Sequence, residues 1–262
     1  RPIYDPTRIL TKALRKRTKK QLWQKMIQKN TDSIESSLRK AKSALSIDAH
    51  SALCHIQDGS AELGSNLILA TGTAPSIRRT ISKLEAAMSK VGRSDLFDEY
   101  VSLYGMPETL EKADFLCEQL KQGYKEIWAY MNEKAVGPAY MVQQQSSGPW
   151  FKNRIQPIFE HDQRDLVWLV LIEYPFILGF IFKTIGIDGF PEHVFEPFKN
   201  LGDPPTRWVN RHRRILGLIP EKSIARLLSM AEELNDQVKS LAAGSVSDKD
   251  AVCLALYFFF FP

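Results

Sequence analysis

The chain is poor in cysteine and in recognisable catalytic motifs. Its three cysteines, Cys54, Cys117 and Cys253, are far apart and odd in number, so they form neither a disulfide framework nor a zinc spacing and fit a reducing compartment. The five histidines are scattered. A glycine-rich phosphate loop, HExxH and paired CxxC are all missing from the sequence. We therefore expect a protein that is not an enzyme and that uses no metal ion and no cofactor.

The alternation of apolar and polar residues that marks β-strands is also nearly missing. Apolar residues recur instead at intervals of three and four, as they do on one face of a helix. The sequence therefore predicts an all-α fold. Helices are expected over about residues 8–29, 33–48, 63–69, 76–91, 94–104, 108–131 and 221–242. Ser94 is expected to cap the fifth of these.

Long uninterrupted apolar runs are scarce. Residues 166–182 come closest, but they contain Glu173 and Pro175 and are shorter than the roughly 20 residues that cross a bilayer. A buried core helix, bent or broken near the proline, is favoured over a membrane span. We therefore expect no membrane insertion.

Charge is concentrated at the N-terminus although the net charge is only +5. Residues 1–20 contain eight basic residues against one acid, Asp5. Residues 1–29 also carry a thin apolar stripe that includes Ile9, Leu10 and Leu14, too little to hold a helix firmly onto its own chain. Such a stripe suits a groove on a neighbouring copy. The alternative is a cationic tail that binds an anionic partner by itself.

Two further features suit nucleic acid, and each has an ordinary alternative. Arg78, Arg79 and Lys83 lie on the polar side of the 76–91 helix, behind a Gly/Thr/Pro loop that should leave backbone N–H groups free for phosphate. A solvated helix face is the alternative. Phe115 lies about 200° from the apolar stripe of the 108–131 helix. It is either packed under another element or a platform on which a base could stack.

Seven short segments occur in an order that resembles the nucleoproteins of phleboviruses and tenuiviruses. The resemblance covers about residues 63–235 and does not include residues 1–62. The segments are Leu67-Ile68-Leu69-Ala70-Thr71, Arg78-Arg79-x-x-x-Lys83, Ala113-Asp114-Phe115-Leu116-Cys117, Gly137-Pro138-Ala139-Tyr140, Phe176-Ile177-Leu178-Gly179-Phe180, Phe195-Glu196-Pro197-Phe198, and His212-Arg213-Arg214 before Leu216-Gly217-Leu218.

The resemblance implies two helical lobes flanking a basic cleft that holds single-stranded RNA. In this chain it implies an oligomerisation arm over residues 1–30, an N-terminal lobe over 31–115 and a C-terminal lobe over 116–262. By the same resemblance, phosphates are held by Arg78, Arg79, Lys83 and either Arg213 or Arg214. Bases are faced by Phe115 and Phe180. The arm, with Ile9, Leu10 and Leu14, docks onto the next protomer.

The implied function is that of a viral nucleoprotein. It encapsidates single-stranded genomic RNA without sequence specificity and oligomerises head-to-tail into a ribonucleoprotein. The expected partners are RNA, further copies of the chain and the viral RNA polymerase, in the virion and the host cytoplasm. The arginines at 207–214 lack the tight turn of a helix-turn-helix, which leaves phosphate contact or a solvated surface. The alternative function is a helical scaffold or effector that binds a protein partner or a membrane.

Overall fold

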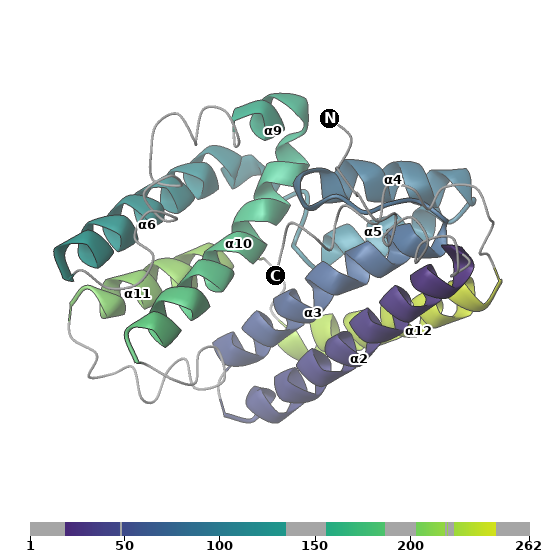
Figure 1. Cartoon of the computed structure of the whole chain (residues 1–262), viewed down its shortest axis with the longest axis horizontal. Coiled ribbons are helices and arrows are strands. Elements are labelled where there is room, and N and C mark those ends of the chain that lie inside the picture. Colours follow the sequence, from purple (N-terminus) through teal and green to yellow (C-terminus); the bar gives the residue numbers. More distant parts are fainter. Residues whose placement is uncertain are drawn as a thin grey trace, which may run out of the picture.

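A computed structural model describes residues 19–47, 49–134, 156–186, 203–217, 219 and 223–244, and every structural statement below concerns these residues. Throughout this part of the chain, all regular elements are helices (Figure 1). The all-α prediction is therefore confirmed for the described residues.

The helices follow one another along the chain with two short 3-10 turns between them. Their bounds are α2 (Lys19–Leu45), α3 (Ala49–Ala70), η1 (Ile77–Arg79), α4 (Thr80–Lys90), α5 (Ser94–Ser102), η2 (Leu110–Lys112), α6 (Ala113–Lys134), α9 (Gln156–His161), α10 (Gln163–Thr184), α11 (Pro205–Leu216) and α12 (Ile224–Gly244). Gly72 and Gly92 adopt positive φ angles of 74° and 70°, which end α3 and α4 where the sequence predicted breaks. Ser94 does not cap α5, because the preceding Arg93 occupies the cap position.

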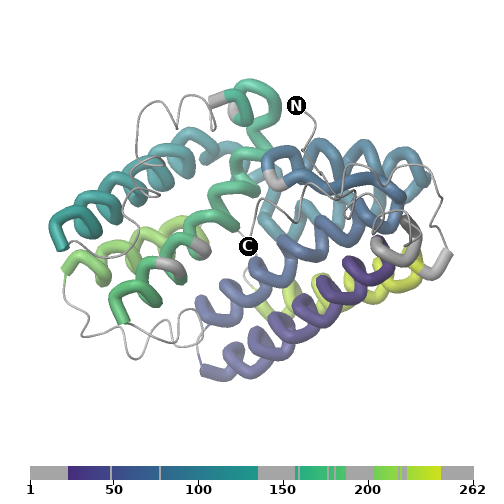
Figure 2. Tube along the Cα trace, in the orientation of Figure 1, coloured from purple at the N-terminus to yellow at the C-terminus, as the bar shows by residue number. Residues whose placement is uncertain are grey.

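Helices α2, α3, α4, α5 and α12 pack on one another, and α6, α9 and α11 pack on α10 (Figures 1 and 2). Buried hydrophobic residues from both sets belong to one core cluster. Helix α10 also contacts α3 and α4. The last helix, α12, returns to pack on α2, α3 and α5. Helix α12, which was expected in the C-terminal lobe of residues 116–262, thus packs against helices that were expected in the N-terminal lobe. The lobe bounds stay a prediction.

Helix α2 runs without interruption through the break expected near residue 30. Thr31 Oγ donates to the Ile27 carbonyl at 2.7 Å, and Asn66 of α3 donates to the same carbonyl at 3.1 Å. The polar residues of α2 near position 31 therefore face α3, and the helix does not end there. Trp23 and Ile27 are buried in the chain's own core. Within the expected arm of residues 1–30, Trp23 and Ile27 thus pack in the chain's own core, and Ile9, Leu10 and Leu14 lie outside the described residues, so the arm stays a prediction.

Helix α10 is the apolar segment that the sequence singled out. It is long and apolar enough to cross a membrane by length and composition, but 75% of its most apolar window is buried inside the protein. The prediction of a buried core helix is confirmed. A helix bent or broken near Pro175 was expected, and the structure shows no break, because α10 continues through the proline. At its start the Asp162 side chain accepts a hydrogen bond of 2.9 Å from the Arg164 amide and caps the helix.

Two glycines let helices approach closely. A Cβ at Gly64 of α3 would lie 2.4 Å from Tyr100 Oη, and a Cβ at Gly123 of α6 would lie 2.3 Å from a ring carbon of Tyr174. Tyr100 Oη donates to the Ser60 carbonyl at 3.0 Å and accepts from Trp168 Nε1 at 2.8 Å. These contacts tie α3 and α5 to α10, and α10 to α6, and so fix the helices that carry the candidate site.

Candidate functional site

The sequence placed the first cluster of cations at the start of α4. Arg78 and Arg79 lie on η1, and both side chains are exposed. Arg79 has φ −140° and ψ 39°, so the backbone leaves the helical conformation there. The expected helix over residues 76–91 is therefore interrupted at Arg79, which separates Arg78 and Arg79 from Lys83. Lys83 is half-buried, and its Nζ donates to the Ala74 carbonyl at 3.1 Å. Lys83 thus braces the preceding loop, while the two arginines face solvent.

The backbone amides at this helix start are not available to a phosphate. The amides of Ile81 and Ser82 donate to Asp165 Oδ1 of α10 at 2.6 Å and 3.3 Å. Ser82 Oγ donates to the same carboxylate. The expectation of free N–H groups is wrong, because a buried carboxylate from a residue 84 positions later occupies the place of the anion.

Asp165 belongs to a charged network that fastens α4 to α10. Burial raises the pKa of Asp165 above its usual value, although the hydrogen bonds from Ser82 and Ile81 oppose that shift. The pKa of Asp162 lies below its usual value. Burial alone would raise it, but the hydrogen bonds from Arg164 together have the larger, opposite effect. Arg164 Nη2 also contacts Glu85 Oε2 at 2.7 Å. These partners give the network a structural role.

Phe115 is exposed, as its position off the apolar stripe predicted. Its relative exposure is 41%, which contradicts the alternative that another element covers it. It begins a polar stripe on α6 that continues through Gln119, Gln122 and Glu126 at steps of four, three and four residues. Phe115 therefore stands at the end of a polar face and is not part of the core.

Helix α11 presents a matching stripe of arginines to that face. Arg207, Arg211 and Arg214 are four and three residues apart and share one side of the helix. Arg211 is buried: its Nη2 contacts Glu126 Oε1 at 2.6 Å, and its Nη1 donates to Gln119 Oε1 at 3.0 Å. The Arg211 guanidinium thus spans two residues of the α6 stripe.

The two helices run in opposite directions (Figure 1). The ring of Trp208 lies 5.3 Å from the ring of Tyr130, whereas Arg211, farther along α11, reaches back to Gln119. Arg214 is three residues beyond Arg211, which moves it about 4.5 Å toward the start of α6. Arg214 therefore lies toward the end of the helix pair where Phe115 is exposed. We call Phe115, Gln119, Arg211 and Arg214 the α6–α11 edge.

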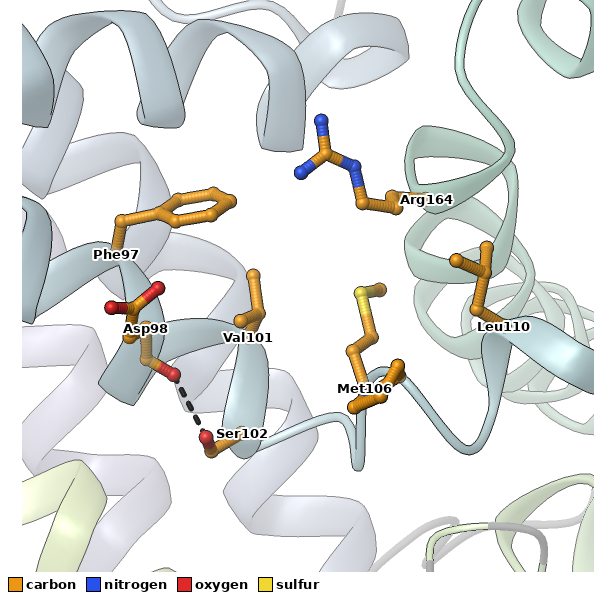
Figure 3. Close-up of a pocket in the computed structure, with 8 residues that line it drawn as sticks. Phe97, Asp98, Val101, Ser102, Met106, Leu110 and Arg164 are labelled. Carbon is orange, nitrogen blue, oxygen red and sulfur yellow. Dashed lines mark hydrogen bonds between the residues drawn. The ribbon is translucent and has the colours of Figure 1, made fainter.

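The start of α4, which follows the η1 arginines, and η2, which precedes α6, both lie near the first turn of α10. Asp165 in the first turn of α10 bonds to the start of α4, as described above. Arg164, its neighbour, lines a cavity of about 300 Å³ together with Leu110 of η2 (Figure 3). Phe97 also lines this cavity, and its ring centroid lies 5.8 Å from the Arg164 guanidinium carbon. The first turn of α10 thus connects the two regions in which the sequence placed RNA contacts.

The remaining expected site residues are less well supported by position. Arg213 lies about 200° from Arg211 around α11, away from the α6 stripe, and its Nη1 donates to Asn210 at 3.3 Å. Of the alternatives Arg213 and Arg214, only Arg214 lies on the side of α11 that carries Arg211. Phe180 belongs to α10, but its side chain lies outside the described residues.

The sequence predicted phosphate contact or a solvated surface for the arginines at 207–214, which is wrong for Arg211, because it is buried and paired with Glu126. The sequence assigned no role to Gln119. The signal that could have found Arg211 is the proline pair before residue 207, since Pro205 occupies the first turn of α11 and marks a helix start. Once that helix is drawn, Arg207, Arg211 and Arg214 fall on one face. The pairing with Gln119, 92 positions away, has no signal in a single sequence.

The described residues contain no group of three or more His, Cys, Asp or Glu that could hold a metal ion. The chemistry on offer at the α6–α11 edge is therefore that of an exposed aromatic ring, an amide and guanidinium groups. No known family model, no curated protein and no solved structure matches this chain, so the resemblance to the phlebovirus and tenuivirus nucleoproteins rests on its seven short segments.

Proposed function

We propose that this chain is a nucleoprotein that coats single-stranded RNA without sequence specificity. The observation that carries the proposal is the exposed ring of Phe115 on the same helix edge as Arg214. Single-stranded RNA offers flat bases and phosphates in alternation, and proteins bind it by stacking bases on aromatic rings and pairing phosphates with cations. A ring and a guanidinium on one edge match that alternation.

The pairing of the arginines supports the same reading. Arg93, Arg164 and Arg207 each hold a carboxylate of this chain, as do the buried Arg211 and the exposed Arg39. The guanidinium groups of Arg79 and Arg214, by contrast, make neither a hydrogen bond nor an ion pair within the described part of the chain. An external anion can therefore bind these two cations without breaking a pair between them and a described residue.

Assembly into head-to-tail oligomers is part of the proposal. A heterologous contact of that kind closes into rings or continues as filaments. Because residues 19–30 pack in their own core, the segment proposed to reach the next protomer is residues 1–18, with Ile9, Leu10 and Leu14 as its apolar anchors. The proposed partners are RNA, further copies of the chain and a viral RNA polymerase, in the virion and the host cytoplasm.

The test is RNA binding by the purified chain at several salt concentrations. For single strands, the logarithm of affinity should fall with the logarithm of salt at roughly −0.7 per phosphate contacted. Nuclease-treated protein, checked by its 260/280 absorbance ratio, is titrated with labelled single-stranded RNA and with duplex of the same length. Single strands should bind tighter. Equal binding of duplex and single strand would contradict base stacking and leave only phosphate contact, whereas no binding to either would favour a helical scaffold that recognises a protein.

A further inference from the structure

The Arg211 guanidinium fixes the orientation of one amide on the α6–α11 edge. A guanidinium carries only hydrogen-bond donors, so the atom of Gln119 that faces it must be the carbonyl oxygen. The structure has this arrangement, with Arg211 Nη1 donating to Gln119 Oε1 at 3.0 Å. Arg211 is itself held by Glu126 at 2.6 Å and is buried, so it cannot swing away freely.

The other end of the Gln119 amide is therefore a fixed donor. Its Nε2 amine makes no hydrogen bond to any described residue, and the side chain is only half-buried. Gln119 follows Phe115 by one helical turn on the same face of α6, where residues four apart are neighbours. A base stacked on the Phe115 ring would consequently lie next to an N–H₂ group that can donate and cannot accept.

We infer that Gln119 biases the RNA contact toward uracil and guanine, which carry a carbonyl oxygen at pyrimidine position 4 or purine position 6, over cytosine and adenine, which carry an amine at that position. The inference rests on the proposed RNA function and adds a base-selecting residue to it. An amide donor bonds to a carbonyl oxygen, whereas two facing N–H₂ groups leave both donors unpaired. The bias concerns base class at one stacking position and requires no sequence motif. Arg211 acts as the positioning residue.

Gln122 provides a matched control one turn farther along the stripe. Its Nε2 donates to Glu126 Oε1 at 3.0 Å. The Gln122 amide thus contacts the Arg211–Glu126 ion pair through its nitrogen, whereas the Gln119 amide contacts the pair through its oxygen. Gln119→Met and Gln122→Met each remove one amide and one hydrogen bond to the Arg211–Glu126 pair. Only the first removes the donor beside Phe115.

The experiment measures the affinity of the whole chain for oligouridylate and oligocytidylate of equal length. Uracil and cytosine have similar rings and differ at position 4, where one has a carbonyl and the other an amine. The ratio of the two dissociation constants is compared between variants, so the stacking of each RNA on itself cancels. The native chain should prefer uridylate by about two- to tenfold, the value of one neutral hydrogen bond.

The variants then separate the outcomes. Gln119→Met should bring the ratio close to unity, Gln122→Met should leave it unchanged, and Gln119→Glu, which replaces the donor by an acceptor, should favour cytidylate. Arg211→Met/Glu126→Met replaces a buried pair by apolar groups, which folded proteins often tolerate. It should lower the ratio because the Gln119 amide can then turn over. Binding with the same ratio in native and Gln119→Met chains would overturn the inference alone, whereas no binding to either RNA would overturn the proposed function as well.

Discussion

Replacing Phe115 and Arg214 one at a time separates base stacking from phosphate contact at the α6–α11 edge. Phe115→Ala removes a ring that is 41% exposed and contributes little to the core, so the melting temperature should change little. If one base stacks on this ring, the loss is about 1–3 kcal/mol, or about 5- to 150-fold in dissociation constant. The slope of affinity against salt should stay the same, because stacking releases no counterions.

Arg214→Ala should show the reverse pattern. This guanidinium makes no ion pair with the described residues, so its loss leaves no buried carboxylate unpaired. Affinity should fall, and the salt slope should become shallower by about 0.7, the share of one phosphate on a single strand. Fluorescence anisotropy over a range of salt concentrations measures both quantities. If Phe115→Ala lowers the melting temperature by several degrees and binds RNA normally, the ring is a packing residue and the stacking argument is wrong.

Three further predictions concern the cations of η1, the N-terminal segment and a buried histidine. Arg78→Ala/Arg79→Ala should weaken RNA binding and flatten the salt slope while leaving the melting temperature unchanged, because both side chains are exposed; a normal affinity in the folded variant would return them to a solvated surface. Deleting residues 1–18 should leave a folded protein that is monomeric by light scattering after nuclease treatment, and rings formed by this variant would show that assembly does not depend on these residues. Deleting residues 1–29 should unfold the protein, as measured by circular dichroism, because Trp23 and Ile27 are buried in the core. Burial lowers the pKa of His212 to about 3 in the folded chain, whereas in the unfolded chain it is about 6.5. As the pH falls through about 6.5, the His212 imidazole is therefore protonated in the unfolded chain only. The free energy of unfolding should drop by about 2 kcal/mol between about pH 7 and pH 5. Chemical denaturation at both pH values should show that drop in the native chain and a smaller one in His212→Asn.

The helices that sequence patterns predicted best are those whose core face is unbroken. The stripe over residues 108–131 predicted α6, and the residues Leu120, Tyr124, Ile127 and Met131 of that stripe are buried. The sequence predicted two helices, over residues 8–29 and 33–48, where the structure has the continuous helix α2, in which Asn30 and Thr31 are helical. The structure explains the difference: these side chains face Asn66 of α3, and a partner 36 positions away cannot be read from local spacing.

Some features of the candidate site could likewise be predicted from local sequence, and others depend on residues distant in sequence. The exposure of Phe115 followed from its angle on one helix, which is a local property. The backbone amides at the start of α4 are occupied by Asp165, and the orientation of the Gln119 amide is fixed by Arg211. Both partners are distant in sequence. Periodicity therefore identified which side chains leave the core, while the pairing between helices decided which of them remain available to a ligand.

The most direct test of the account is to map where RNA touches the protein. Ultraviolet irradiation of the chain with uridine-containing single-stranded RNA, followed by digestion and mass spectrometry, locates the cross-linked peptides. Stacking on Phe115 with Arg214 on the same edge predicts adducts in the first turns of α6 and in the last turn of α11, and their loss in Phe115→Ala. Adducts confined to other described helices, such as α12, with none on α6 or α11, would contradict the placement of RNA on the α6–α11 edge.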